Sequence, residues 1–482
     1  MTIRRFLLVS GSAVMLAACA TAYPPAQSTA TLPAQWQEAL PNTEKNVELR
    51  KWWQLHGDAT LLELIEAAQS ASPTIAQAWS RIETARAARV ATGAALLPSV
   101  DAVANASRGK NQPGVAAATT AQAGLQTSWE IDVFGANQAS NRAAQADLEG
   151  SQALWHDARI SVAAEVAQLY FSVLSCQQVA ELSLQDAKSR AETARLTELS
   201  AQAGMSANVN VTLARASAAE GNSRAIQQAA QCDLDIKGLV ALTAKPEPEL
   251  RQKLAAASET SKNLLPLGVS SIPAQLLVQR PDVYAAEKEV TAASAQVGAA
   301  EARRYPRLSL SGSIGTMRYS SMGSDTRTDT WSVGPLALSL PLFNGGQTSA
   351  NIEAAKARYV AASSNFHAKV RQAVREVEEA MVNLNSTDAR RLDSDMSARG
   401  YQQVLHATAA RYEKGMASLF ELEDARRTAF ASQSALISLQ LERNRAWIAL
   451  YRALGGGWNA AEQDSSPARM SSVNLPAGKS KS

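Results

Sequence analysis

The chain has 482 residues and a nearly balanced charge, with 47 lysine and arginine side chains against 44 aspartate and glutamate side chains. This balance gives no sign of a nucleic-acid-binding protein, which would concentrate basic residues on one surface. The four histidines, at 56, 156, 367 and 406, lack metal-ligand spacing and no G-x-S-x-G or H-E-x-x-H motif occurs, so the sequence predicts no enzyme and no metal or organic cofactor.

The first residues have the pattern of a lipoprotein signal peptide. Two arginines precede an apolar run too short to span a bilayer, and the run ends in Leu-Ala-Ala-Cys at residues 16–19. That ending resembles the bacterial lipobox, which implies that residues 1–18 are removed and that Cys19 receives a covalent lipid. Ala20 follows, where an aspartate tends to cause inner-membrane retention, so we expect the outer membrane. An ordinary secretory signal with a chance cysteine is the alternative.

The rest of the chain contains two copies of one unit of about 200 residues. Pro73 and Pro98 correspond to Pro281 and Pro306 at an offset of 208, and the later landmarks correspond at offsets of 209 to 211. We therefore expect a lipidated N-terminal segment at 19–60, repeat 1 at 61–268, repeat 2 at 269–460 and a polar tail at 461–482.

Each copy contains one predicted hairpin of two strands in which apolar and polar residues alternate. The predicted strands are about 99–108 and 121–134 in the first copy and about 306–318 and 330–343 in the second, joined by polar loops at 109–120 and 320–329. About ten residues is the length of a strand that crosses an outer membrane. A soluble sandwich with one face in water is the alternative. The polar face is predicted to comprise Gln122, Gln126, Glu130, Asp132, Ser309, Ser311 and Ser313.

Each copy then continues as a very long helical hairpin, about 137–242 in the first and 347–454 in the second. These stretches lack proline and are rich in strong helix formers. A first helix of roughly 65 residues would be about 100 Å long at 1.5 Å per residue. Each hairpin is predicted to turn at a Gly-Met pair, Gly204-Met205 or Gly415-Met416, because glycine commonly follows the end of a helix.

A phenylalanine and a glycine-containing cluster precede each long helix. Phe134 and Phe343 are predicted to occupy the last strand position, at the membrane–water boundary, where aromatic residues gather. The glycines after them would allow the backbone to turn sharply into the helix.

Four strands per chain are too few to close a membrane barrel, and an open sheet edge in lipid leaves backbone groups without hydrogen bonds. The sequence therefore predicts that copies of the chain share one barrel. Two copies would form an eight-stranded barrel whose interior is filled by side chains, whereas three would form a twelve-stranded barrel around a water-filled channel. The polar strand faces favour the trimer. The expected fold class is an α+β membrane protein, a trimeric twelve-stranded barrel continued by a barrel of long helices.

These features together resemble the outer membrane factor family, the TolC-like trimeric export channels, in the lipoprotein subgroup of OprM and NodT. The resemblance covers nearly the whole mature chain and implies a passive efflux channel for small molecules in the outer membrane, extending into the periplasm. It also implies a periplasmic adaptor and an inner-membrane pump, most often of the resistance–nodulation–division class. A protein-secretion duct and a non-conducting stalk are the alternatives. The matching motifs are Trp52-Trp53 with Asp58 and Leu61, Arg280-Pro281-Asp282-Val283 with Ala286-Glu287, Pro341-Leu342-Phe343-Asn344-Gly345-Gly346, and Arg411-Tyr412 with Gly415.

The same resemblance implies that Arg411, Tyr412 and Asp424 close the periplasmic end of the duct as a ring of three chains. A solvated helix carboxylate is the alternative for Asp424. The first copy has Leu213 where the second has Asp424, so only the second hairpin is expected to line this gate. The hairpin tips expected to contact the adaptor contain Gly204, Met205, Gly415 and Met416.

Two cysteines remain after lipidation, Cys176 and Cys232, and their positions average to 204, where the first helical hairpin turns. Residues equally far from the turn of an antiparallel hairpin lie at the same height. In an oxidising compartment this register predicts a disulfide. Two buried reduced thiols are the alternative.

Overall fold

The structure is a computed structural model that describes residues 23–30, 36–38, 49–110, 116–260 and 280–460. The predicted signal peptide, Cys19 and the polar tail at 461–482 lie outside the described residues. The chain divides into two compact units, which are treated separately below. Unit 1 consists of residues 1–31, 77–155 and 282–369, and unit 2 of residues 32–76, 156–281 and 370–482.

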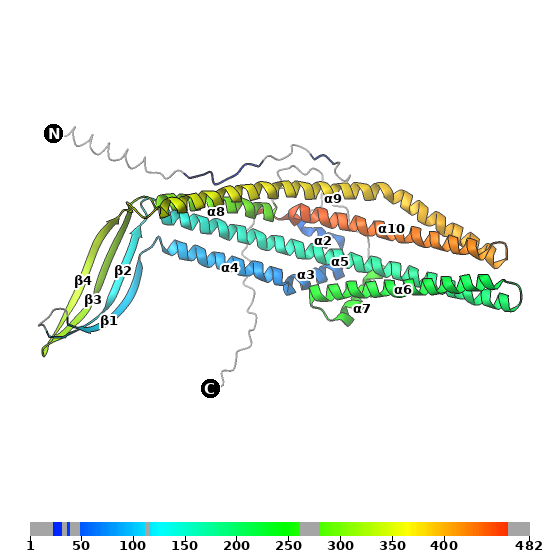
Figure 1. Cartoon of the computed structure of the whole chain (residues 1–482), viewed down its shortest axis with the longest axis horizontal. Coiled ribbons are helices and arrows are strands. Elements are labelled where there is room, and N and C mark those ends of the chain that lie inside the picture. The colour runs from blue at the N-terminus through cyan, green and yellow to red at the C-terminus, as the bar shows by residue number, and fades with distance from the viewer. Residues whose placement is uncertain (1–22, 31–35, 39–48, 111–115, 261–279, 461–482) are drawn as a thin grey trace. The chain divides into compact units, whose positions relative to one another are not determined.

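The two halves of the sequence form the same succession of elements (Figure 1). The first half contains α4 (Pro73–Ala94), β1 (Ser99–Gly109), β2 (Ala118–Ile131), α5 (Ala136–Gln202) and α6 (Asn208–Thr243). The second half contains α8 (Pro281–Ala302), β3 (Arg307–Ser321), β4 (Ser324–Ser339), α9 (Gln347–Glu413) and α10 (Leu419–Ala453). The other described elements are η1 (Leu49–Lys51), α2 (Trp52–His56), α3 (Ala59–Ala71), α7 (Glu247–Thr260) and η3 (Gly455–Gly457).

Equivalent helices of the two halves have equal or nearly equal lengths, which confirms the internal repeat. α4 and α8 each contain 22 residues, and α5 and α9 each contain 67 residues. The two 22-residue helices that precede the strands are not among the elements predicted from the sequence. Among the described helices, none is both long and apolar enough to cross a membrane.

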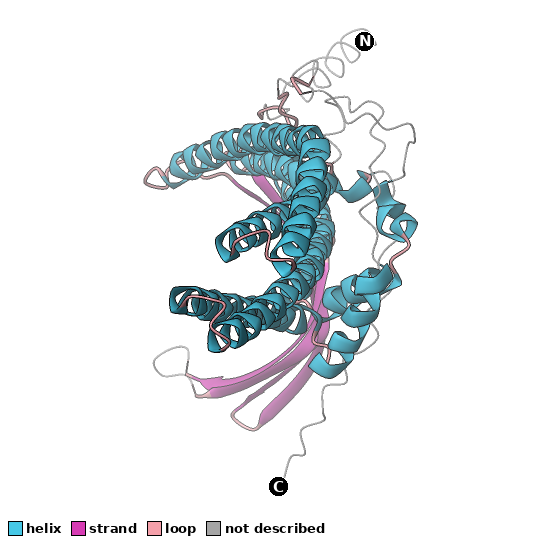
Figure 2. Ribbon diagram, turned by 90° about the vertical axis from the view of Figure 1, so that its right-hand side faces the viewer, coloured by secondary structure: helices cyan, strands magenta, loops and turns pink. Residues whose placement is uncertain are grey.

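The four strands form one antiparallel sheet in the order β1-β2-β3-β4 (Figure 2, magenta). The hairpins of the two copies therefore join through β2 and β3, which pair from Ala118 with Ser321 to Ile131 with Leu308. Successive side chains of a strand point to opposite faces, so the pairing sorts the residues by polarity. Polar pairs on one face include Gln126 with Ser313 and Glu130 with Ser309, and apolar pairs on the other include Leu125 with Ile314 and Trp129 with Leu310.

A bulge in β4 keeps its large apolar residues on one face. The register between β3 and β4 shifts between Leu310 and Gly312, opposite Gly334-Pro335. Without this shift, the alternation of β4 would put half of its apolar residues on the polar face. On the apolar face, Trp331 pairs with Ile314, Val333 with Gly312, Leu336 with Leu310 and Leu338 with Leu308.

The predicted starts of two strands are wrong. β2 begins at Ala118 and β4 at Ser324, and the polar loop predicted at 320–329 is instead a two-residue turn, Met322-Gly323. Both turn residues have positive φ, 51° and 81°, as a type I′ hairpin turn requires. The start of β4 is rich in serine, threonine and aspartate, a composition typical of loops, although threonine also suits strands.

The predicted positions of Phe134 and Phe343 are also wrong. β2 ends at Ile131 and β4 at Ser339, so both rings lie in the connection to the following helix. Phe134 stacks on Tyr305, with ring centroids 4.9 Å apart. The expected positive φ occurs after each phenylalanine, at Gly135, Gly345 and Gly346.

Asp132 does not belong to the polar face of the sheet, contrary to the prediction. Its carboxylate accepts hydrogen bonds from the backbone N–H groups of Asn137 (3.2 Å) and Gln138 (2.7 Å) at the start of α5. The first N–H groups of a helix have no partner within the helix, and an aspartate can satisfy them. Asp132 therefore caps α5.

The core of unit 2 forms around the first of the matching motifs. Trp52 is fully buried and stacks on Tyr451 of α10, with ring centroids 5.0 Å apart. Asp58 caps α3 by accepting a hydrogen bond from the Leu61 N–H at 3.0 Å, and it accepts a second from the Tyr170 hydroxyl of α5 at 2.6 Å. These residues are therefore structural, because they join the N-terminal helices to both helical hairpins.

The second motif also joins helices of unit 2. The Arg280 side chain is 7% exposed and lies 2.8 Å from the Glu376 carboxylate of α9. It also donates a hydrogen bond to the Ala453 carbonyl at the end of α10, at 3.1 Å. A buried guanidinium needs such partners, so Arg280 connects α9 to the end of α10.

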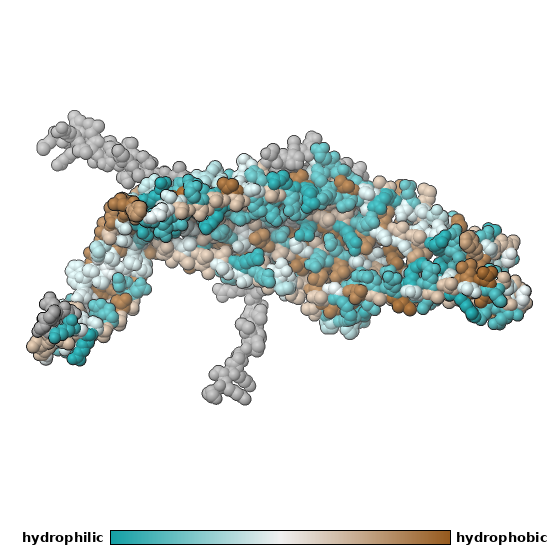
Figure 3. Space-filling model, in the orientation of Figure 1, coloured by the Kyte–Doolittle hydropathy of each residue, from teal (hydrophilic) through white to brown (hydrophobic). Residues whose placement is uncertain are grey.

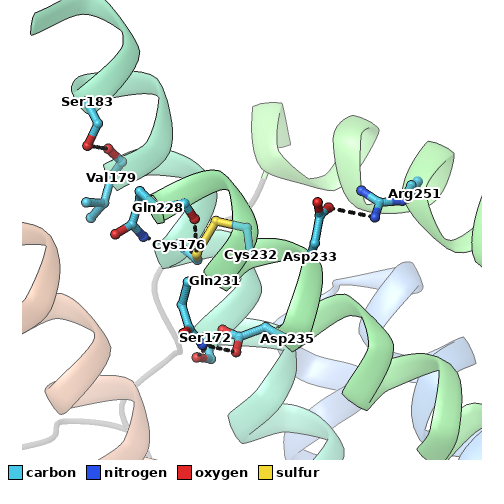
Figure 4. The surroundings of a disulfide bond; sticks show 10 residues. All are labelled: Ser172, Cys176, Val179, Ser183, Gln228, Gln231, Cys232, Asp233, Asp235 and Arg251. Atoms are coloured by element: carbon cyan, nitrogen blue, oxygen red, sulfur yellow. Dashed lines mark hydrogen bonds and ion pairs between the residues drawn. A yellow bond between two sulfur atoms is a disulfide. The ribbon is translucent and has the colours of Figure 1, made fainter. Parts of the chain in front are cut away.

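A disulfide joins the two helices of the first hairpin (Figure 4). Cys176 of α5 and Cys232 of α6 have Cα atoms 5.5 Å apart, at the height that their distance from the turn predicts. Both residues are buried, and the Gln228 side-chain amide donates a hydrogen bond to the Cys176 sulfur at 3.2 Å. No described residue of the second hairpin is a cysteine.

Replacing both cysteines by serine is expected to lower the free energy of unfolding by about 2–4 kcal/mol, because the disulfide restricts a long loop of the unfolded chain. Urea denaturation in detergent, followed by helical circular dichroism with and without a reductant, measures this loss. The reductant should destabilise the wild-type protein and leave the Cys176→Ser/Cys232→Ser variant unchanged. Two free thiols per chain in denatured, unreduced protein would contradict the disulfide.

Candidate functional site

The two helical hairpins turn through the same backbone motif. The glycine of each turn has positive φ, 75° at Gly204 and 70° at Gly415. The N–H of the following methionine donates to a carbonyl of the last helical turn at 2.8 Å, Met205 to Ser200 and Met416 to Arg411. This Schellman pattern satisfies carbonyls at the helix end and requires a left-handed residue, which glycine supplies without strain.

Both turns expose large apolar side chains, and Figure 3 shows brown surface among hydrophilic side chains near the ends of the helical hairpins. Met205 is 78% exposed and Met416 is 59% exposed. The next helix of each hairpin adds one more, Val209 at 70% and Phe420 at 72%. Exposed apolar side chains that gather in this way are typical of surfaces that a partner protein covers.

The three residues expected to form the gate lie near the second turn, each with its own partner. Arg411 donates from Nη2 to the Met416 carbonyl at 3.0 Å. The Tyr412 hydroxyl lies 3.2 Å from the Thr197 hydroxyl of α5. Within the described part of the chain, no hydrogen bond or ion pair joins the side chains of Arg411, Tyr412 and Asp424.

Asp424 is the carboxylate of the expected gate, and it is exposed. Its side chain is 54% exposed and forms an ion pair with Arg427, which is 75% exposed. Both residues lie in the first turns of α10. An exposed pair of this kind is weak, so the carboxylate remains available to a second chain.

Apolar contacts hold Tyr412 against the first hairpin. Ala194 of α5, Ala214 of α6 and Leu419 of α10 form a small buried cluster, and the tyrosine packs against it. The helices α5, α6 and α10 approach one another closely because two of these three residues are alanines, whose side chains are small. The second hairpin is therefore packed onto the first near its turn.

A set of buried charges, which the sequence analysis did not identify, also joins α10 to the first hairpin. Arg190 of α5 lies 2.8 Å from Asp186 and 2.7 Å from Glu423 of α10. Glu423 lies 2.8 Å from Arg426. The four side chains are only 5% to 13% exposed. We call Asp186, Arg190, Glu423 and Arg426 the buried ion cluster.

Hydroxyl groups complete the hydrogen bonds of the buried ion cluster. Arg190 donates to the Ser217 hydroxyl of α6 at 2.6 Å. Arg426 donates to the Ser189 and Thr193 hydroxyls of α5 at 2.8 Å and 2.7 Å. Two guanidinium groups and two carboxylates balance, so the unit buries paired ions without a net charge.

One residue of the sequence does point to this cluster. Gly221 lies inside α6, where glycine costs about 1 kcal/mol relative to alanine. A Cβ added there would lie 2.8 Å from the Cδ atom of Arg190. At Gly221, a glycine within a long helix coincides with a close approach by an arginine side chain.

Glu423→Gln is expected to lower the free energy of unfolding by about 3–5 kcal/mol, because it leaves two buried arginines with one carboxylate. The matched control is Glu442→Gln, which breaks an exposed pair with Arg390 (53% and 52% exposed) and should cost less than about 1 kcal/mol. Urea midpoints of both variants, at an unchanged denaturant slope, measure the difference. Equal shifts would show that the cluster does not hold the hairpins together.

Known proteins resemble the chain over nearly its whole length. The family model described as outer membrane efflux protein matches residues 64–245 and 272–456, once on each copy of the repeat. The pyoverdine export outer membrane protein OpmQ of Pseudomonas aeruginosa is 28% identical, over 96% of this chain and 99% of its own. Nodulation protein T of Rhizobium leguminosarum bv. viciae is also 28% identical, over 95% of each chain.

Solved structures agree with these matches. The outer-membrane channel OprN superposes with a TM-score of 0.78 at 27% identity, over 91% of this chain and 99% of that chain. This agreement confirms the resemblance read from the motifs and the predicted fold class. The chain belongs to the outer membrane efflux protein family, and it is a channel protein of the Gram-negative outer membrane that extends into the periplasm.

Proposed function

We propose that three copies of this chain form a passive duct that exports small molecules across the outer membrane. The duct is the outer-membrane part of a tripartite efflux system, together with a periplasmic adaptor and an inner-membrane pump of the resistance–nodulation–division class. The observation that carries this proposal is the four-stranded sheet with one apolar face, one polar face and two open edges, β1 and β4.

The open edges favour assembly of several chains. β1 has 11 residues and β4 has 16, and each pairs with only one strand of the described chain. In lipid, every unpaired backbone group costs several kcal/mol, so β4 of one copy would pair with β1 of the next. Three copies supply twelve strands, enough for a bore lined by the polar face.

The helical hairpins extend the duct. α5 and α9 each contain 67 residues, about 100 Å at 1.5 Å per residue. Three chains would assemble six hairpins into a cylinder of twelve long helices. The exposed turns at Gly204-Met205 and Gly415-Met416 are the proposed contacts with the adaptor.

The cargo is proposed only as a class, small molecules such as drugs and other toxic compounds. The names of the two relatives refer to pyoverdine export and to nodulation, so members of this family serve different processes. A wide bore lined by hydroxyl and amide groups has little selectivity of its own. The pump and the adaptor therefore select the cargo.

The proposed anchor is a covalent lipid on Cys19, at the end of the apolar run. Native mass spectrometry tests assembly and anchor together. We expect one species with the mass of three chains that start at Cys19 and carry three lipids, and Cys19→Ala should remove the lipid mass. A stable monomer or dimer would contradict the closure of the sheet, whereas a trimer of unlipidated chains would contradict only the anchor.

The proposed gate consists of Arg411, Tyr412 and Asp424 from three chains. The exposed Asp424 carboxylates would form the constriction. Tyr412 would hold the second hairpin inward through Thr197 of α5, and Arg411 would stabilise the turn of its own hairpin through the Met416 carbonyl. Opening would move α9 and α10 outward. The disulfide holds the first hairpin together meanwhile. The second hairpin has no cysteine among its described residues, so the Tyr412 contact and the buried ion cluster are what limit its movement.

Asp424→Ala combined with Tyr412→Ala is expected to leave the duct open, because the constriction and its link to α5 are both lost. Single-channel conductance in planar bilayers measures the closed fraction. The matched control, Asp393→Ala with Tyr401→Ala, removes an exposed aspartate and an exposed tyrosine elsewhere on α9 and should stay closed like the wild type. An unchanged closed fraction in the gate variant would contradict the gate.

The same recordings separate the proposed duct from its alternatives. Absence of conductance in every variant would favour the non-conducting stalk. A conducting protein whose loss does not sensitise cells to toxic small molecules would favour a protein-secretion duct.

A further inference from the structure

The apolar face of the sheet becomes polar and positively charged toward the hairpin turns. From the helices outward, its rows begin with large side chains such as those of Leu308 and Leu310. The last two rows before the turns contain three arginines instead. These rows are Ala106, Ala121, Arg318 and Arg327, followed by Arg108, Thr119, Ser320 and Asp325.

The arginine rows lie at the height of the outer lipid headgroups. Leu308 and Arg318 are separated by ten positions of β3, about 34 Å along the strand at 3.4 Å per residue. A strand tilt of about 40° reduces this to about 26 Å across the membrane, close to the apolar band of about 25 Å in outer-membrane barrels. The long helices follow the other ends of the strands and are periplasmic, so this boundary belongs to the outer leaflet.

A groove of about 720 Å³ lies on this face beside the arginines. Four alanines line one part of it, Ala104 and Ala106 of β1 with Ala121 and Ala123 of β2. The polar residues that line it are Asn105, Gln122, Thr316, Arg318, Asp325 and Arg327. The groove exists because these four alanines stand next to the larger Leu125 and Ile314 rows. An acyl chain is the group that fits an apolar depression facing lipid.

Two arginines of this face have no acidic partner among the described residues of the chain: Arg327, which lines the groove, and Arg108, which lies outside its lining in the next row toward the turns. Arg318 forms an ion pair with Asp325, with Nε 2.9 Å from both carboxylate oxygens. Arg327 donates from Nε to the Thr316 hydroxyl at 3.1 Å, which leaves its two terminal nitrogens unused. Among the described residues, neither Arg327 nor Arg108 has an acidic partner.

The remaining charges near the groove are Lys110, at the end of β1, and Asp329, in the row of Thr316. Four basic groups therefore face two carboxylates. Guanidinium groups without a carboxylate, at the edge of a hydrophobic surface, favour a phosphate, which can accept two parallel hydrogen bonds from each.

We propose that this groove binds the phosphorylated, multiply acylated sugar lipid of the outer leaflet. Its phosphates contact Arg108 and Arg327, and one acyl chain occupies the part lined by the four alanines. The sugar lipid fits better than a glycerophospholipid because it is the outer-leaflet lipid and carries two phosphates, one for each arginine that has no acidic partner among the described residues of its own chain. The site rests on the outer-membrane location of the sheet and not on export, so conductance is unaffected by its loss.

Native mass spectrometry of the purified protein with added purified lipid A tests the site. Arg108→Gln/Arg327→Gln is expected to weaken lipid A binding about tenfold or more, since two charge-assisted hydrogen-bonding groups are lost. The matched control, Arg304→Gln/Arg307→Gln, changes two arginines at the periplasmic end of β3 and should bind lipid A like the wild type.

Dephosphorylated lipid A and phosphatidylglycerol are the competing ligands. Lipid A should bind more tightly than both to the wild-type protein, and Arg108→Lys/Arg327→Lys should restore part of the affinity. Equal binding of dephosphorylated lipid A, or equal losses in the two double variants, would overturn the phosphate site. Equal binding of phosphatidylglycerol would overturn the choice of lipid. The same spectra show whether each variant assembles. If the double variant does not assemble, the single variants Arg108→Gln and Arg327→Gln provide the binding test.

Discussion

Backbone hydrogen bonding at the two edges of the sheet is the constraint on which the rest of this protein depends. β1 and β4 each have one neighbouring strand in the chain, and their other sides present N–H and C=O groups that only another strand can satisfy away from water. The chain cannot close on itself, because four strands do not make a barrel. The duplication supplies each copy with one strand hairpin and one helical hairpin, so chains that complete the sheet also bring their long helices together.

In unit 2, the position of a charge determines whether it serves stability or remains available to another chain. Glu423 and Asp424 are neighbours in the sequence, but successive residues of a helix point about 100° apart. Glu423 is therefore 13% exposed between two arginines, whereas Asp424 is 54% exposed beside Arg427. A buried ion pair is costly to break, whereas an exposed ion pair is weak. The side of α10 that carries Glu423 is therefore held against the first hairpin, and the side that carries Asp424 remains available to another chain.

The arginines of the sheet differ in the same way. Arg318 is neutralised by Asp325 within its own hairpin, and that pair connects β3 to β4 across the turn. Arg108 and Arg327 have no such partner among the described residues, although they lie on the same face. A charged side chain on a lipid-facing surface has few groups nearby that can neutralise it. The nearest such group is an anionic lipid headgroup.

The sequence by itself determined the repeat, the lengths of the long helices, the glycine turns and the register of Cys176 with Cys232, because each depends on periodicity or on distance along the chain. The sequence did not predict the starts of β2 and β4 or the capping role of Asp132, since serine, threonine and aspartate suit loops, strands and caps alike. Only the tertiary structure decided which charges are buried. Arg190 and Glu423 lie 233 positions apart, and the helical pattern does not say which polar side of a helix meets a neighbour. The bulge at Gly334-Pro335 likewise follows from pairing with β3, which no local pattern contains.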